Sequence, residues 1–184
     1  MNSIQRHRTI RGHTAAPRNL VAYSEDVSTW TGSAGTSPPL GLNALGRFSG
    51  YALISNGESW HRKEFHEFAV VQAEPVCTTI WLRQGSSQSI LFRVRDLDAQ
   101  RSYTYSAALD ALPDTMGGHT LFSDTLLADG ISRKLTFTTL MDFSGLARME
   151  IGPFSDVAQD DIIILAAQVE RGDHPTAYQY KGLS

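Results

Sequence analysis

The chain has 184 residues and a mass of 20.2 kDa, which fits one domain with a short extension. Apolar residues make up 41% and charged residues 19%, a composition that supports a packed core and excludes a wholly disordered chain. The single cysteine, Cys77, excludes an internal disulfide framework and a cysteine-based metal cluster, and its apolar neighbours predict a buried thiol. No apolar run approaches the roughly 20 residues of a membrane-spanning helix, so we expect no membrane insertion.

The net charge of −3 hides an uneven distribution along the chain. Residues 1–18 contain no acidic residue and four arginines, Arg6, Arg8, Arg11 and Arg18. The remaining residues hold 12 basic and 19 acidic side chains. We therefore expect a basic N-terminal arm, residues 1–18, followed by an acidic domain, residues 19–184. Because phosphate neutralisation needs a basic surface, an acidic domain argues against a nucleic-acid partner.

The arm is polar and aperiodic, and it lacks the apolar segment of a signal peptide, so we expect no signal peptide. Two roles remain open for it. The arm either docks on an acidic surface of a partner protein or is a leader without a role. Further along the chain, the Gly-, Ser- and Pro-rich residues 31–50 predict a long surface connection.

From residue 51 onward, short strand-like segments alternate with Gly-, Asp-, Asn- and Ser-rich turns, a pattern typical of an all-β antiparallel sandwich or barrel. The predicted strands are Tyr51–Ile54, Glu64–Val71, Val76–Gln84, Ser89–Arg95, Ser102–Leu109, Gly118–Leu126, Arg133–Leu140, Ala147–Ile151 and Asp161–Glu170. The apolar residues alternate within several of these segments, as expected for strands with one buried face. The last segment is apolar on both faces, which predicts a central strand covered on both sides.

Two segments at opposite ends of the domain share their pattern with a known family. Residues 19–31 contain the string NLVAYSEDVSTWT, and residues 164–178 contain ILAAQVERGDHPTAY. Together they resemble the opening and closing strands of jelly-roll domains in tailed-phage structural proteins, which are similar to carbohydrate-binding modules and concanavalin-like sandwiches. The resemblance implies an antiparallel jelly-roll β-sandwich with an extended N-terminal arm, in which Leu20 and Tyr23 lie near Ile164 and Ala166.

The resemblance also implies a function. It predicts a non-enzymatic virion protein of a tailed phage or phage-like particle, assembled in the bacterial cytoplasm, in which the arm binds other virion proteins and the jelly roll binds host cell-surface polysaccharide. One alternative is an architectural decoration or adaptor protein that binds no glycan. Another is the accessory module of a polysaccharide-degrading enzyme. A homo-oligomer stays open, because the sequence contains no heptad or β-helix repeat to specify one.

Catalytic and phosphate-binding motifs are absent, since the sequence contains no G-x-S-x-G, Walker, G-x-G-x-x-G or H-E-x-x-H pattern. His61, Glu64 and His66 form the densest titratable cluster, where a weak metal site is weighed against an ordinary solvated strand surface. Paired aspartates lie in predicted turns, where their side chains commonly bond the backbone. We expect no enzymatic activity and no cofactor, and a structural calcium stays open with no ligands assigned.

A carbohydrate site needs aromatic rings that stack on sugars and polar groups that bond hydroxyls. If residues 76–84, 89–95 and the following strand share an outward face, they form a basic and aromatic groove suited to an acidic polysaccharide. The predicted groove residues are Trp81, Arg83, Arg93, Arg95, Tyr103 and Tyr105, with Trp60 at the rim. The alternative places Trp81 and both tyrosines in the core. Exposed rings at Trp81 and Tyr105 would favour glycan binding, and buried rings would favour an architectural protein.

Overall fold

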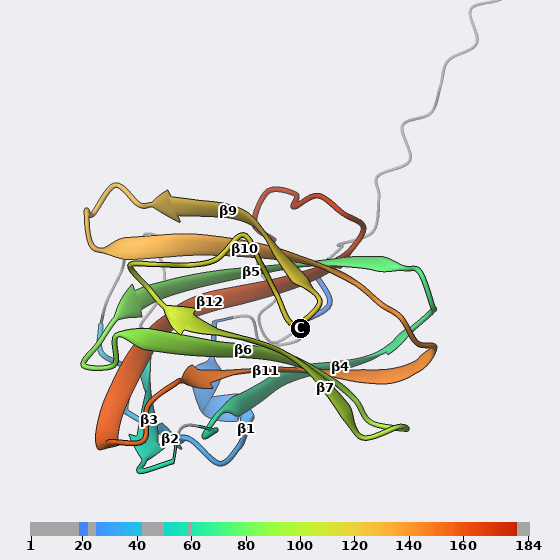
Figure 1. Cartoon of the computed structure of the whole chain (residues 1–184). Coiled ribbons are helices and arrows are strands. Elements are labelled where there is room, and N and C mark those ends of the chain that lie inside the picture. Colours follow the sequence, from blue (N-terminus) through green and yellow to red (C-terminus); the bar gives the residue numbers. More distant parts are fainter. Residues whose placement is uncertain (1–18, 22–24, 42–49, 59, 180–184) are drawn as a thin grey trace, which may run out of the picture.

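The computed structural model describes residues 19–21, 25–41, 50–58 and 60–179. Within these ranges the chain forms two antiparallel sheets that pack face to face, with one short 3-10 helix, η1 (Val27–Thr29) (Figure 1). The predicted N-terminal arm lies outside the described residues. None of the residues described here forms a helix long and apolar enough to cross a membrane.

The two sheets differ in size. The five-stranded sheet has the order β1 (Thr31–Gly32), β4 (Lys63–Val70), β11 (Gly145–Pro153), β6 (Ser89–Asp96) and β7 (Arg101–Ala108). The seven-stranded sheet has the order β2 (Gly35–Thr36), β3 (Tyr51–Asn56), β12 (Ala158–Arg171), β5 (Pro75–Gln84), β10 (Ser132–Leu140), β9 (His119–Leu126) and β8 (Thr115–Met116). This arrangement is the antiparallel jelly-roll β-sandwich that the sequence predicted.

All nine predicted strands are confirmed, with ends that differ by a few residues. The sequence did not reveal β1, β2 and β8, because each has only two residues and two residues cannot display an alternation. Two of these short strands, β1 and β2, lie within residues 31–50, so part of the predicted long connection pairs with the edges of both sheets.

The core lies between the sheets and consists of alternate side chains from their strands. Phe92 of β6 stacks on Phe137 of β10 with ring centroids 4.8 Å apart, so the two sheets meet through this contact. Tyr105 of β7 packs edge-on against Phe137 at 4.9 Å, and its hydroxyl donates to the Pro113 carbonyl at 2.6 Å. Burial raises the pKa of Tyr105 to about 12, so the phenol stays protonated.

His119 of β9 is a buried polar side chain that links the two sheets. Its Nε2 lies 2.8 Å from the Tyr103 carbonyl oxygen of β7, which can only accept a hydrogen bond, so Nε2 carries the hydrogen. Its Nδ1 therefore accepts from the Thr139 hydroxyl, 2.7 Å away. Burial lowers the pKa of His119 to about 4, so the ring is neutral near pH 7.

β12 is central in its sheet, between β3 and β5, as predicted for a strand that is apolar on both faces. Ile162 and Val169 point into the core, whereas Leu165 contributes to a second buried cluster on the outer face of the sheet. That cluster is built around Trp81, which Tyr178 covers edge-on with ring centroids 4.7 Å apart. The chain after β12 therefore covers the sheet that β12 belongs to.

The first and last described segments are bonded side by side. Asn19 donates from its backbone N–H and side-chain amide to Gln179 at 3.1 and 2.9 Å, and its Oδ1 accepts from the Val169 N–H at 3.2 Å. The Leu20 N–H donates to the Val169 carbonyl at 2.8 Å. We call these four residues the terminal junction. It confirms that the opening segment lies beside the closing strand, although Leu20 bonds further along β12 than predicted. Tyr23, for which the same position was predicted, lies outside the described residues.

Candidate functional site

The outer face of the five-stranded sheet carries two rows of polar side chains that run across the strands. The strand register places Glu64, Glu150, Arg93 and Thr104 in one row, and Glu67, Arg148, Arg95 and Ser102 in the next. Phe92 and Met149, which alternate with these residues, belong to the core. The two rows therefore lie on the opposite side of the sheet, and we call these eight residues the charged face.

Glu150 is the buried centre of the charged face. Its side chain is 0% exposed, whereas those of Arg62 and Arg93 are each 14% exposed. Both arginines donate through Nε to Glu150 Oε2, with an Arg62 distance of 2.6 Å. Glu150 Oε1 and Arg93 Nη2 have no hydrogen-bond partner among the described residues. One carboxylate thus fixes two largely buried guanidinium groups, and one buried atom of Glu150 and one of Arg93 are left without a partner among the described residues.

The second row is organised by Arg148. Its guanidinium forms ion pairs with Glu64 at 2.8 Å and Glu67 at 2.5 Å. Both glutamates of β4 in the charged face are therefore paired with Arg148. Arg95, in the same row, donates to the side chain of Gln100. Among the described residues, Arg93 of β6 pairs with Glu150 and Arg95 forms no ion pair, while the β4 side carries Glu64 and Glu67.

Trp60 is an exposed aromatic ring at one end of the charged face. The indole is 49% exposed, and the Arg62 guanidinium carbon lies 5.7 Å from its centroid. The segment before β4, which contains His61 and Arg62, crosses over β11 at Gly152, where no side chain stands in its way. A Cβ atom on Gly152 would lie 2.1 Å from the His61 carbonyl oxygen and 2.8 Å from the Arg62 Cα. The missing side chain thus makes room for Arg62 above Glu150.

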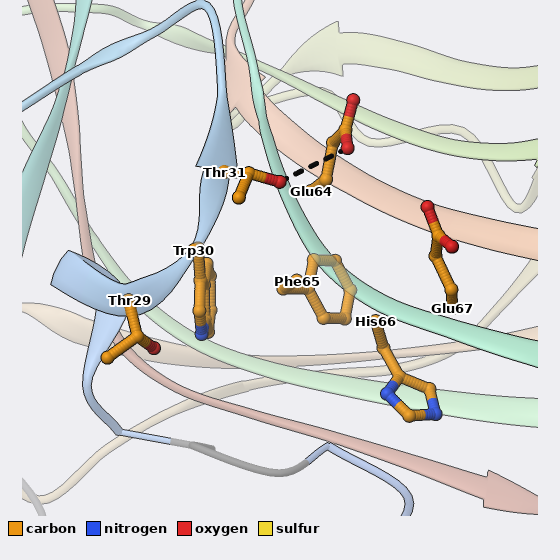
Figure 2. A pocket seen from close by; sticks show the side chains of 7 residues that line it. All are labelled: Thr29, Trp30, Thr31, Glu64, Phe65, His66 and Glu67. Atoms are coloured by element: carbon orange, nitrogen blue, oxygen red, sulfur yellow. Dashed lines mark hydrogen bonds between the residues drawn. The ribbon is translucent and has the colours of Figure 1, made fainter.

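A hollow of about 200 Å³ lies beside the other edge of the charged face, where β1 pairs with β4 (Figure 2). Its lining residues are Thr29, Trp30, Thr31, Glu64, Phe65, His66 and Glu67. The Trp30 and Phe65 rings pack against each other with centroids 5.2 Å apart, and the Thr31 hydroxyl donates to Glu64 at 3.2 Å. Both rings belong to the hydrophobic core, and each residue is 6% exposed.

The predicted groove is wrong as a single surface, because β5 and β6 belong to different sheets. Trp81 and Arg83 lie on the seven-stranded sheet, and Trp81 is 4% exposed beneath Tyr178. Tyr103 packs against the core, and Tyr105 is buried in it. The alternative that placed both tyrosines in the core is the one observed, whereas Trp81 is buried outside the core, in the separate cluster beneath Tyr178.

Three of the predicted residues do belong to one region. Arg93 and Arg95 are part of the charged face, and Trp60 stands at its end through its contact with Arg62. Sequence reasoning missed Arg62, Arg148 and Glu67, and it considered Glu64 only as a possible metal ligand. The alternation of Arg148 and Glu150 on one strand could have indicated a charged face. Their ion-pair partners, however, can be identified only from the register of β4, β11 and β6.

The titratable cluster at His61, Glu64 and His66 does not assemble into a metal site. Its Glu64 and His66 do not share one side of β4, because Phe65 forms a bulge between them; Figure 2 shows the Glu64 carboxylate turned toward Thr31 and the His66 ring turned away from it. Among the described residues, no three His, Cys, Asp or Glu side chains are grouped so as to hold a metal ion. Cys77 is buried, and burial raises its pKa to about 12, as befits a packed thiol.

Comparison with known proteins identifies the fold. The sequence matches no family model and no curated protein. Among solved structures, the CBM22-1 xylan-binding domain of Paenibacillus barcinonensis Xyn10C is 12% identical with a TM-score of 0.52, and the match covers 88% of this chain and 100% of that domain. TmCBM61 in complex with β-1,4-galactotriose is 11% identical with a TM-score of 0.50, covering 84% and 99% of the two chains.

An arabinose-bound MgGH51 α-L-arabinofuranosidase is 11% identical with a TM-score of 0.52. This match covers 84% of the present chain but only 26% of the enzyme. The fold is that of carbohydrate-binding modules. These structural matches lend no support to the resemblance with phage virion proteins.

Proposed function

We propose that this domain binds a polysaccharide on the charged face, without catalysis. One observation carries the proposal: Arg62 contacts both the buried carboxylate of Glu150 and the exposed indole of Trp60. Charged groups and an aromatic ring are thus adjacent on one surface. A sugar offers hydroxyls that both donate and accept, together with an apolar face that stacks on an aromatic ring. The structural likeness to carbohydrate-binding modules supports the same function.

We propose an acidic polysaccharide as the ligand. Arg62 and Arg93 share one carboxylate, Glu150, and Arg95 on β6 makes no ion pair with the described residues, so this part of the face carries excess positive charge. Guanidinium groups bond carboxylates in a planar, two-point geometry. The glutamates at the β4 side of the face would accept hydrogen bonds from hydroxyl groups of the same polysaccharide.

Affinity electrophoresis in gels that contain polygalacturonate or a neutral galactan tests this proposal. We expect retardation by polygalacturonate, and a loss of roughly tenfold in affinity for Trp60→Ala and for Arg95→Gln. Phe122→Ala is the matched control, because Phe122 is 47% exposed on the other sheet and should leave binding unchanged. Retardation by galactan alone would contradict an acidic ligand. If polygalacturonate retarded Trp60→Ala as much as the parent protein, binding on the charged face would be contradicted.

A second candidate function is architectural, and a specific observation favours it. The rings of Trp81 and Tyr105 are 4% and 0% exposed, which is the outcome expected for an architectural protein rather than for a groove at those positions. If no polysaccharide retards the protein, this function replaces glycan binding.

A place in a tailed-phage virion remains part of the proposal and rests on the resemblance of the two terminal segments alone. The basic arm, with Arg6, Arg8, Arg11 and Arg18, would bind other virion proteins. Deletion of residues 1–18 should leave a folded domain that no longer joins the particle. Normal incorporation of the shortened chain would rule out anchoring by the arm.

A further inference from the structure

A second hollow lies on the seven-stranded sheet, apart from the charged face. It forms where β5 ends and the β9–β10 hairpin turns, and its volume is about 650 Å³. Its lining residues are Arg83, Gln84, Gly85, Asp124, Leu126, Gly130, Ile131 and Arg133. None of these belongs to the charged face, so any ligand here would occupy a site of its own. We call it the hairpin hollow.

One wall of the hairpin hollow is apolar and exposed. Leu126 and Ile131 stand on either side of the hairpin turn and are 61% and 49% exposed. The turn is fixed by a 2.7 Å hydrogen bond from the Leu127 N–H to the Ser132 carbonyl, and Gly130 adopts a left-handed φ of 71° within it. Two aliphatic side chains are thus exposed to solvent on a well-defined hairpin, which is a typical feature of a contact surface.

The acidic groups near the hollow are already engaged. Asp124 binds Arg133 through both oxygens, and Arg133 also donates to the Leu109 carbonyl. Asp129 accepts from the Ser132 hydroxyl and N–H at 2.6 and 2.8 Å, and these bonds hold its pKa below the usual value. Neither carboxylate forms a hydrogen bond or ion pair with a further cation among the described residues.

Arg83 is that further cation. It is half-buried, and it makes no hydrogen bond or ion pair with any of the described residues. Its charge acts on Asp129 only through space, as one cause of the lowered pKa of that carboxyl. A partly desolvated guanidinium gains most from an oxyanion that reaches two of its N–H groups at once.

We propose that the hairpin hollow binds an organic carboxylate with an apolar body. The carboxylate would pair with Arg83, and the body would cover Leu126 and Ile131. A sugar acid suits this site poorly, because its hydroxyls would lie against aliphatic side chains that offer no hydrogen bond. The ligand class therefore differs from the polysaccharide proposed for the charged face, and the two proposals can fail independently.

Titration of the ¹⁵N-labelled full chain with phenylacetate, followed by NMR, tests the proposal. We expect saturable shifts centred on the amides of Gly85, Gly130 and Ile131, with a dissociation constant on the order of millimolar for so small a ligand. Phenylacetamide has nearly the same shape without the charge and should bind about tenfold more weakly. Arg83→Gln should show the same loss and should fold, because Arg83 has no partner to lose.

Two further variants make the result specific. Arg95→Gln removes the same charge from the charged face and should leave phenylacetate binding unchanged. Ile131→Ser should weaken binding while the remaining spectrum stays that of the folded protein. Equal binding of the amide, unchanged binding by Arg83→Gln, or shifts scattered over the surface would each overturn the proposal.

Discussion

Glu150 shows how one buried side chain determines the properties of a surface. Removing one partner from a buried ion pair is costly, because the remaining charges lose their counterion. Glu150→Gln should therefore lower the free energy of unfolding by about 3 kcal/mol, measured by urea denaturation. Glu67→Gln is the control, since Glu67 is 42% exposed and its loss should cost less than about 1 kcal/mol. Similar losses in the two variants would show that Glu150 has no special role.

The neutral state of His119 predicts a pH dependence of stability. Its folded pKa of about 4 lies below the 6.5 of an unperturbed histidine, so the unfolded chain binds the proton first as the pH falls. This contribution to stability is complete above pH 6.5 and is lost progressively down to pH 4, by on the order of 3 kcal/mol.

Urea denaturation between pH 4 and pH 7 measures this effect. The variant His119→Gln should be less stable near pH 7 and should lose less stability on acidification than the parent. The control His174→Gln, at a side chain that is 71% exposed, should follow the parent curve. Parallel curves for His119→Gln and the parent would contradict the assignment.

At the scale of elements, the alternation of residues was enough to predict nearly every strand, but not the sheet to which each belongs. The turn after β5 shows why. The Ser86 N–H donates to the Asp161 side chain at 2.8 Å, and the Ser87 N–H donates to the Asp161 carbonyl at 2.9 Å. These bonds hold the turn in which the chain passes from the seven-stranded to the five-stranded sheet. The contact joins residues far apart in sequence, so no local pattern could show that Trp81 and Arg93 would face opposite sides.

The crossing at Gly152 is the element-scale feature that builds the candidate site. Gly152→Ala should displace the segment from His61 to Arg62, lower the free energy of unfolding by about 3 kcal/mol, and weaken polysaccharide retention along with it. Urea denaturation and affinity electrophoresis measure the two effects. Gly35→Ala provides the comparison, because the nearest atom to its Cβ would be the Ile54 Cβ at 3.3 Å, and the nearest backbone atom would be the Ile54 carbonyl oxygen at 3.6 Å. A Gly152→Ala protein as stable as Gly35→Ala would mean that the crossing tolerates a side chain.

At the scale of the whole molecule, the terminal junction ties the opening segment to the final strand. Asn19 is fully buried and bonds both β12 and Gln179, so truncating it leaves several backbone groups without partners. Asn19→Ala should cost about 3 kcal/mol of unfolding free energy in urea denaturation. Gln100→Ala, at an exposed turn, should cost little by comparison. The end motifs in the sequence predicted this adjacency, whereas the individual bonds depend on the register of β12.

The terminal junction has a consequence for how the domain can be connected to other polypeptides. Because the chain enters at Asn19 and leaves at Gln179 through hydrogen-bonded neighbours, the folded unit has a single point of attachment. Such a unit can be spliced into a surface loop of a host protein without stretching that loop, and its own ends can be joined and reopened elsewhere. A circular permutant opened at the exposed Asp129–Gly130 turn should therefore keep the sandwich intact.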